Sequence, residues 1–277
     1  AATRAATGMA TGTALAQDQL SALADIVGPD RVLAGPEASE QYGRDWTRAH
    51  APAPCAVVLP GSIGEVQAVV RYARRAGLAI VPSGGRTGLS AGAVAARGEL
   101  VLVLDRLNAI EDFSPVDRTV RCGAGAVTAD LQAFAEDQGL FYPVDFASAG
   151  SSQVGGNVAT NAGGIKVIRH GMTRDWVAGL KLVTGTGELL DLNRGLIKNN
   201  AGYDLRHLVI GSEGTLGVIV EVTVSLADPP GDLAVMVLGV PDMAAIMNVL
   251  HCARGRLELH AFEFFSEDAL ARVVEHQ

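Results

Sequence analysis

The glycine-rich run at residues 150–171 (GSSQVGGNVATNAGGIKVIRHG) limits the possible folds more than any other part of the chain. Six of its 22 residues are glycine, and few of its side chains are large enough to build a core. Glycine lets main-chain N–H groups come close to a ligand, at an entropic cost that an ordinary loop has no reason to bear. Val154, Val158 and Ile165 lie within the run, whereas flexible linkers contain few β-branched residues. The run predicts a backbone that follows a long polar, anionic or planar ligand; a flexible surface loop is the alternative.

A second glycine cluster, PSGGRTGLSAGA at residues 82–93, follows apolar residues that predict a strand. Its glycines free successive backbone N–H groups to converge on one point, and such a nest binds anions. We expect a pyrophosphate or a similar anion there. Arg86 either adds positive charge beside that anion or is an exposed arginine without a partner.

Several rival sites are disfavoured by inspection. The chain contains neither GxxxxGK[ST] nor a GxGxxG that follows a strand and opens a helix. Residues 88–92 (GLSAG) match the GxSxG pattern of hydrolase nucleophiles, but that pattern requires a helix directly after the serine. A strand follows at residues 99–105 instead, so Ser90 is disfavoured as a nucleophile.

Apolar spacing predicts a chain that mixes helices and strands. Ser62 and Glu65 are spaced as a capping box, and Thr128 is placed to cap a later helix. Residues 217–226 alternate valine with other residues, which predicts a strand with one buried face. The other predicted helices and strands are a helix at 18–27, strands at 55–60, 78–82 and 99–105, paired strands at 110–114 and 119–125, and a hairpin at 179–192.

Pro229 and Pro230 mark the clearest boundary, because consecutive prolines end a strand. Beyond them, a strand at 233–240, a helix at 242–255 and a strand at 257–265 predict a β-α-β unit, followed by a helix from residue 267. Such a unit cannot cover its own sheet, so we expect sequence beyond Gln277, or another subunit, to complete a second domain.

Composition narrows the class of protein. A length of 277 residues suits one large domain or two unequal ones, and the net charge of -8 argues against a nucleic-acid surface. Cys55, Cys122 and Cys252 are far apart, which favours buried thiols in a reducing compartment over disulfides or a zinc site. No apolar run is long enough to span a membrane. We therefore expect a cytoplasmic protein.

Three segments together resemble one known family. PSGGRTGLSAGA, then residues 141–183 (FYPVDFASAGSSQVGGNVATNAGGIKVIRHGMTRDWVAGLKLV), then residues 199–226 (NNAGYDLRHLVIGSEGTLGVIVEVTVSL) are similar to the FAD-linked 2-hydroxy-acid dehydrogenases of the vanillyl-alcohol oxidase superfamily. The resemblance implies an α+β fold, with a PCMH-type FAD-binding domain of two α/β subdomains at 50–229. An N-terminal arm would occupy 1–49, and a ferredoxin-like cap would begin at 230–277.

The resemblance also implies where FAD binds. The first glycine cluster would surround the pyrophosphate, and the second would lie beside the ribityl chain and the isoalloxazine, with Asn161 and the backbone of Gly163 and Gly164 next to the reactive ring. Glu213, Gly214 and Ile219 would hold the adenine end through their backbone. The implied FAD-binding residues of the two clusters are Ser83, Gly84, Gly85, Arg86, Thr87, Gly88, Gly92, Ala93, Gly150, Ser152, Gly155, Gly156, Asn157, Thr160, Asn161, Gly163, Gly164 and Gly171.

The implied reaction is oxidation of a D-2-hydroxy acid, D-2-hydroxyglutarate first, to the 2-oxo acid by hydride transfer to flavin N5. D-lactate and glycolate are alternative substrates, and a noncatalytic flavin-binding subunit of a larger complex is the alternative of another class. FAD would be noncovalent, because the first cluster reads GGRTG without the His or Cys of covalent members. A flavoprotein or quinone would accept the electrons, and a homodimer is expected.

Catalytic residues, and the ligands of a divalent metal such as Zn, are expected in the later cap. None of the six histidines has metal-ligand spacing. His170 lies near Lys166, Arg169 and Arg174, and this basic cluster either faces a phosphate or substrate carboxylate or forms a solvated face.

Overall fold

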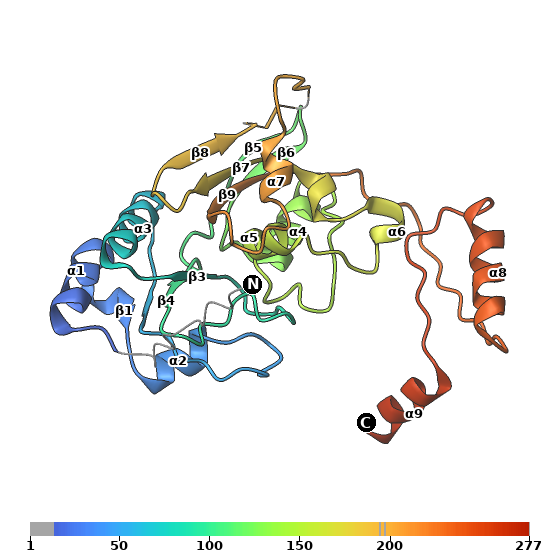
Figure 1. Cartoon of the computed structure of the whole chain (residues 1–277). Helices are drawn as coiled ribbons and strands as arrows, with labels where there is room; N and C mark the ends of the chain where they lie inside the picture. The colour runs from blue at the N-terminus through green and yellow to red at the C-terminus, as the bar shows by residue number, and fades with distance from the viewer. Residues whose placement is uncertain (1–13, 194, 197, 277) are drawn as a thin grey trace, which may run out of the picture.

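The computed structural model describes residues 14–193, 195–196 and 198–276 and contains two β-sheets with helices packed around them (Figure 1). Residues 1–13 of the predicted N-terminal arm lie outside the described residues. The smaller sheet has the strand order β1-β2-β4-β3, and the larger sheet has the order β5-β6-β9-β7-β8. The predicted mixed α and β class is confirmed. Within the described residues, no helix is long and apolar enough to cross a membrane.

The two central strands of the smaller sheet, β2 and β4, are continuous runs of Val, Leu and Ala and are buried on both faces. β2, β4 and β3 are parallel, and β1 joins β2 in antiparallel orientation. Parallel sheets are usually covered on both sides. The elements of this part are α1 (Gln17–Val27), η1 (Pro29–Arg31), β1 (Val32–Leu33), α2 (Pro36–Tyr42), β2 (Ala56–Val58), α3 (Ile63–Ala76), β3 (Ile80–Ser83) and β4 (Leu100–Val103).

Alternate residues of these strands face different helices. Val58 and Leu100 share a buried cluster with α1 and α3, whereas Val57 and Val101 pack with α2. The predicted face of α3, formed by Val66, Val69, Val70 and Ala73, is buried as expected.

The capping box predicted at α3 forms only in part. Ser62 Oγ accepts from the backbone N–H of Glu65 at 3.2 Å, but the Glu65 carboxylate accepts from Gly61 N rather than from Ser62 N. The carboxylate reaches one residue further back, and there it also lies 4.0 Å from Arg106.

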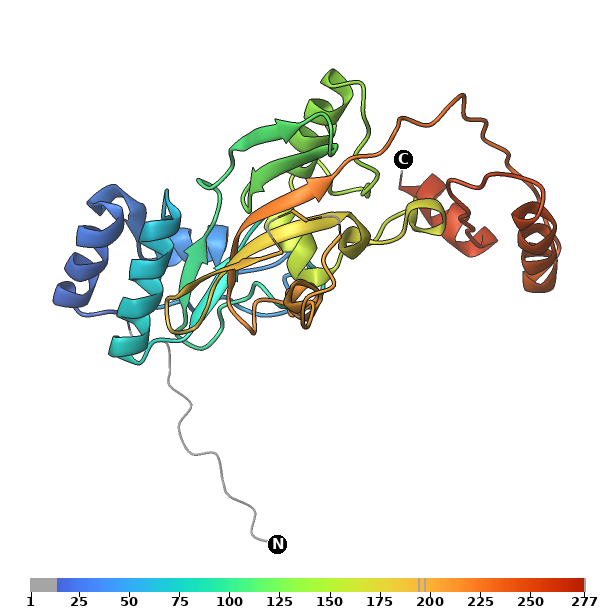
Figure 2. The ribbon, with the colours of Figure 1, turned by 90° about the horizontal axis from the view of Figure 1, so that it is seen from above.

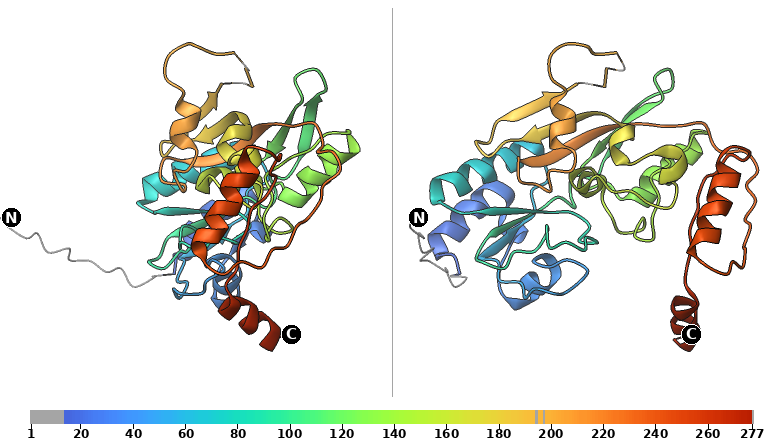
Figure 3. Two further views of the ribbon diagram at one scale, coloured as in Figure 1. Left: turned by 90° about the vertical axis from the view of Figure 1, so that its right-hand side faces the viewer. Right: turned by 45° about the vertical axis from the view of Figure 1, so that its right-hand side comes forward.

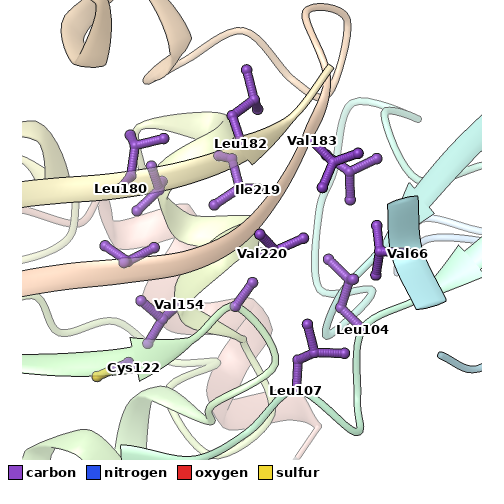
Figure 4. Close-up of a cluster of buried hydrophobic side chains, with 14 of the residues drawn as sticks. Val66, Leu104, Leu107, Cys122, Val154, Leu180, Leu182, Val183, Ile219 and Val220 are labelled. Carbon is purple, nitrogen blue, oxygen red and sulfur yellow. The ribbon is translucent and has the colours of Figure 1, made fainter. Parts of the chain in front are cut away.

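The larger sheet is entirely antiparallel, and β9 is its central strand. Figure 4 shows its core residues continuing through Val183 and Leu104 to Val66 of α3, so the two sheets share one hydrophobic core. Its elements are β5 (Ile110–Ser114), β6 (Thr119–Gly123), α4 (Thr128–Asp137), α5 (Val154–Thr160), α6 (Val167–His170), η2 (Thr173–Trp176), β7 (Val177–Val183), β8 (Leu189–Leu192), α7 (Leu205–Val209) and β9 (Val218–Ser225).

The prediction that β9 buries only one face is wrong. Ile219 and Glu221, on the face expected to be solvated, are both buried. Glu221 tolerates burial because Arg121 of β6 and Lys181 of β7 pair with its carboxylate at 2.9 and 2.8 Å. A central strand has neighbours on both sides, and their side chains cover a face that its own sequence leaves polar.

The chain leaves the sheets after β9, and α8 (Met243–Arg254) and α9 (Glu267–Glu275) lie apart from both sheets in Figures 2 and 3. Leu226 is the last buried residue of the described chain. The strands predicted at 233–240 and 257–265 are absent: both segments lack regular structure and most of their side chains are exposed. A strand needs a hydrogen-bonded neighbour, and none of the described residues pairs with either segment.

The expectation that all three cysteines are buried is wrong for one of them. Cys55 and Cys122 are buried, whereas Cys252 on α8 is exposed. Burial raises the pKa of the Cys122 thiol to about 12. Cys252 differs because α8 packs against neither sheet.

Candidate functional site

The first loop (residues 83–93) leaves the carboxyl end of β3 and touches the second loop (residues 150–171) directly. A Cβ on Gly85 would lie 2.1 Å from the carbonyl oxygen of Ser151 and 2.8 Å from Cα of Ser152. A Cβ on Gly84 would lie 3.2 Å from Oε1 of Gln153. Glycine is therefore required at Gly85 by the other loop, a contact that the sequence prediction assigned to a ligand.

A shared carboxylate joins the two loops. Asp105, just after β4, accepts from Arg86 Nη2 at 3.3 Å and from Gln153 Nε2 at 2.8 Å. Arg86 also lies over the Tyr42 ring, 5.1 Å from its centroid. The alternative of an exposed arginine without a partner is wrong, because Arg86 is half-buried and paired with Asp105. Sequence reasoning missed Asp105 and Gln153; the available signal was a carboxylate ending the buried strand at 99–105.

The tip of the first loop is held from the N-terminal part of the chain. The Asp45 carboxylate accepts from the backbone N–H of Ala91 at 2.9 Å and from Thr47. Burial opposes ionisation of Asp45, but the hydrogen bonds from Thr47 and Ala91 outweigh it and hold its pKa below the ordinary value. Trp46 N donates to the carbonyl oxygen of Gly88 at 3.2 Å.

No helix directly follows Ser90, whereas a hydrolase nucleophile of the GxSxG type requires one.

Thr128 anchors the start of the second loop rather than capping α4. Val127 is the N-cap residue, and Thr128 is fully buried as the first residue of the helix. Its hydroxyl lies 2.8 Å from Ser152 Oγ and accepts from Asn157 Nδ2 at 2.7 Å. The side chains of Ser152 and Asn157 therefore hold the shape of the loop, and sequence reasoning missed this role of Thr128.

The middle of the second loop is the helix α5, which was not predicted from the sequence. A Cβ on Gly155 would lie 2.5 Å from Cβ of Ala124, so this glycine permits close packing on the sheet. Gly156 has open space around it and lies next to Gly84. Thr160 Oγ1 donates to the carbonyl oxygen of Gly156 at 3.0 Å.

The third turn (residues 211–217) completes the arrangement at the end of α5. Glu213 N and Gly211 N donate to the carbonyl oxygens of Ala159 and Val158 at 2.8 and 3.0 Å. A Cβ on Gly92 of the first loop would lie 3.4 Å from the Glu213 carboxylate. Gly214 has a φ of 77°, and a Cβ there would lie 3.3 Å from Pro82 of β3. The fold thus brings the first loop, the second loop and the third turn together around α5.

The rest of the second loop turns sharply around Asn161, which ends α5 with a φ of 49°. Its Oδ1 accepts from the backbone N–H of Arg174 at 3.0 Å. Gly164 approaches the carbonyl oxygen of Asp145 so closely that no Cβ would fit, and Lys166 pairs with the Asp145 carboxylate at 2.9 Å.

The remaining predicted residues differ in exposure. Ile219 is buried in the sheet core and pairs with Leu182, so only its backbone could meet a ligand. Gly163 lies beside Val167, and Gly171 has a φ of 73°. Thr87 and Ala93 are partly buried, whereas Gly88 and Gly150 are exposed.

In the basic cluster around His170, Arg169 and Arg174 are exposed, whereas Lys166 and His170 are half-buried. Arg169 pairs with Glu258, and the His170 and His260 rings lie 5.3 Å apart between centroids. Burial first, and then the nearby His260, lower the pKa of His170. In the described part of the chain, no group of three or more His, Cys, Asp or Glu side chains could hold a metal ion.

The geometry fits a long ligand with an anionic part and a hydroxyl-rich part. Gly88 and Gly156 present backbone with room around it, because an added Cβ would have nothing within 4 Å, as an approaching phosphate requires. Gln153 Oε1 is buried without a hydrogen-bond donor among the described residues. The residues present therefore fit FAD, whose pyrophosphate accepts hydrogen bonds and whose sugar hydroxyls donate them.

The comparisons with known proteins agree with this geometry. A family described as "FAD binding domain" matches residues 54–193. Among solved structures, alkyldihydroxyacetonephosphate synthase superposes with a TM-score of 0.70 at 25% identity, covering 79% of this chain and 41% of that one. 6-Hydroxy-D-nicotine oxidase from Arthrobacter nicotinovorans gives a TM-score of 0.61 at 26% identity, covering 71% and 42%.

The fold and the three glycine segments thus define a flavoprotein domain of the vanillyl-alcohol oxidase type. The chain belongs to the FAD-binding domain family, and the resemblance inferred from its motifs is confirmed.

Two curated relatives of this chain carry the same name. "D-2-hydroxyglutarate dehydrogenase" of Stutzerimonas stutzeri is 60% identical over 252 residues, which cover 91% of this chain and 54% of that protein. The mitochondrial protein of that name from Bos taurus is 37% identical over 264 residues, covering 95% and 48%. The chain spans about half the length of the curated relatives it matches.

Proposed function

We propose that the full-length protein oxidises D-2-hydroxyglutarate to the 2-oxo acid with noncovalently bound FAD. The observation that carries this proposal is 60% identity, over 91% of the chain, to a relative named D-2-hydroxyglutarate dehydrogenase. A match of 252 residues in a chain of 277 must include the three glycine segments and pass residue 230, so the alignment is not limited to the FAD-binding part. The chain spans only half of that relative, which is why the activity is proposed for the whole protein.

FAD supplies the electron sink when it is bound, and the protein supplies position and electrostatics. The backbone N–H groups of the first loop bind the pyrophosphate. The second loop supports the ribityl chain and places Asn161 and Gly164 beside the ring. Because Arg86 is committed to Asp105, backbone dipoles rather than this guanidinium carry most of the anion binding.

Noncovalent attachment is supported by the first loop, which contains no His or Cys. Acid precipitation of the purified protein tests it. Intact FAD is expected in the supernatant, and yellow colour retained in the pellet would contradict the proposal.

We also propose that residues 50–229 form the FAD-binding domain and that 230–277 begin the substrate domain. The loss of all core packing after Leu226 supports this division. The catalytic residues, and the divalent metal that the resemblance implies, are proposed for later substrate-domain sequence. The described residues do not fit a metal, so no step here uses one. Metal analysis of the full-length protein tests the metal.

The electron acceptor is proposed to be a flavoprotein or a quinone, and the assembly a homodimer. The three widely spaced cysteines support a reducing compartment, for which we propose the cytoplasm. Cell fractionation and light scattering test the location and the dimer.

The decisive experiment adds D-2-hydroxyglutarate, L-2-hydroxyglutarate, D-lactate and glycolate separately to the anaerobic full-length protein. Loss of the visible flavin absorbance with D-2-hydroxyglutarate, but not with its L-enantiomer, is expected. A preference for D-lactate or glycolate would assign the protein to that substrate. A yellow protein that none of them reduces would support the noncatalytic subunit, and a protein that takes up no FAD would overturn the proposal entirely.

A further inference from the structure

Gln153 is a buried polar side chain at the junction of the two loops, and its amide oxygen has no hydrogen-bond donor among the described residues. The residue is 6% exposed, and it is the N-cap residue of α5. Its Nε2 donates to Asp105 Oδ1 at 2.8 Å, but its Oε1 has no donor among the described residues. Buried polar atoms are nearly always hydrogen-bonded, so an unpaired one requires an explanation.

The orientation of this amide follows from its partner. A carboxylate only accepts hydrogen bonds, so the NH₂ group of Gln153 must face Asp105 and the carbonyl oxygen must face the other way. The carbonyl oxygen lies next to the first loop, because Oε1 is 3.2 Å from where a Cβ of Gly84 would be. The Cα of Gly156 is 3.9 Å from the same position. The unpaired oxygen is therefore buried where the two glycine segments meet.

The chemistry of the missing partner is restricted. It must donate a hydrogen bond, which the pyrophosphate cannot do at neutral pH, and it must be close to the pyrophosphate, because Gly84 belongs to the anion nest. The sugar hydroxyls are the donors attached next to the pyrophosphate in FAD. The second loop lies on the ribityl side in the proposed arrangement, and Gln153 belongs to that loop.

We propose that Gln153 Oε1 accepts a hydrogen bond from a ribityl hydroxyl of FAD and that Asp105 is a positioning residue that orients the amide. The inference rests on the proposed FAD site and adds a side chain that binds the ribityl part of the cofactor. Asp105 acts only through Gln153 and Arg86, and it does so on both loops at once.

The test uses the full-length protein freed of FAD and measures the Kd of FAD by quenching of flavin fluorescence. Gln153→Leu is expected to raise Kd about tenfold, the size of one lost hydrogen bond. The matched control is Gln67→Leu, which removes a remote amide that donates to the Gly187 carbonyl oxygen at 2.9 Å. This control is expected to lower the Tm of the FAD-free protein and to leave Kd unchanged. If Gln153→Leu behaves like it, Gln153 is only structural and the proposal fails.

FAD analogues that each lack one ribityl hydroxyl identify the donor. One of them is expected to bind the unmodified protein about tenfold more weakly than FAD, and to bind the Gln153→Leu protein as well as FAD does. An analogue that lacks a hydroxyl of the adenosine ribose is expected to lose the same affinity in both proteins. Coupling to the ribose analogue instead, or to none of the analogues, would overturn the assignment.

Two variants distinguish the hydrogen bond that Asp105 accepts from Gln153 from the negative charge that it places beside Arg86. Asp105→Asn and Asp105→Leu both remove the charge partner of Arg86, but only asparagine keeps an oxygen that can accept from Gln153 Nε2. Asparagine is expected to retain the preference for the complete ribityl chain, and leucine to lose it. If both variants keep the preference, the amide does not depend on Asp105. If both lose it equally, Asp105 acts through its charge rather than by accepting from Gln153 Nε2. Either result overturns the positioning role. If the unmodified protein binds no FAD, the proposed function fails as a whole; if it binds FAD but the variants do not differ, only this inference fails.

Discussion

Gly85→Ala is the substitution that most directly tests the contact between the two loops. The added Cβ would lie 2.1 Å from the Ser151 carbonyl oxygen, whereas an ordinary contact begins at 3.4 Å. The loops must therefore separate by about 1.3 Å, because the three atoms nearest to the new methyl group all belong to the backbone of Ser151 and Ser152 and cannot rotate away. Overpacking of this kind costs about 1–3 kcal/mol.

We expect most of this cost to appear in cofactor binding. Separation of the loops relieves the strain in the free protein, whereas FAD binding requires the original spacing. The Kd of FAD should then rise about 5- to 150-fold, with a smaller decrease in the Tm of the FAD-free protein.

The assay is fluorescence titration with FAD, together with thermal unfolding of the FAD-free protein. Gly88→Ala is the matched control for stability: a Cβ there would have nothing within 4 Å, and Gly88 is outside the left-handed region. It should unfold at the same temperature as the unmodified protein. A Gly85→Ala protein with unchanged Kd and Tm would refute the reasoning, because the two loops could not then be in contact.

Three other expectations follow from single residues. Thr128→Val leaves the buried side chains of Ser152 and Asn157 without their partner. It should lower the free energy of unfolding, measured by urea titration, by about 2 kcal/mol. The control Thr215→Val, at an exposed position, should change this free energy by less than about 0.5 kcal/mol. Asp204→Ala removes the N-cap of α7 and should cost about 1 kcal/mol at neutral pH. Hydrogen bonding from Arg206 lowers the pKa of Asp204 from 3.8 to about 2, so this difference should disappear as pH falls through that interval, and a constant difference would contradict the assignment. Cys55 and Cys122 should resist alkylation until the protein unfolds, as followed by mass spectrometry; labelling of both in the native protein would refute their burial.

The site was predictable where its chemistry depends on local sequence. The three glycine segments are each short, and their residue types and spacing are enough to indicate a cofactor with an anionic part. The partners that hold these segments were not predictable. Asp105 and Gln153 are 48 residues apart and meet only because a parallel strand ends beside α5.

Arg86 shows what a local sequence pattern leaves out. From the sequence, the expected partner of the Arg86 guanidinium is an anionic ligand bound by the glycine loop. The sequence does not show that the Asp105 carboxylate also pairs with Arg86. Gly155 and Gly85 are similar cases: both were assigned to a ligand, but Ala124 and the Ser151 backbone already exclude a side chain at these positions. A glycine in the sequence indicates that another group packs closely against the backbone, but it does not show whether that group belongs to a ligand or to the protein.

The sequence by itself determined the elements whose cause is local: continuous apolar runs for the buried parallel strands, the helical face of α3, and turns at glycine. The tertiary structure alone decided which of those elements pack against one another and which side chains become buried between them. Glu221, on the second face of β9, is buried because Arg121 and Lys181 come from neighbouring strands and pair with it. The segments at 233–240 and 257–265 have strand-like patterns but form no strand. The pattern of apolar residues shows which side chains a segment could bury. A strand also needs hydrogen bonds to a neighbouring strand, which the segment cannot supply by itself.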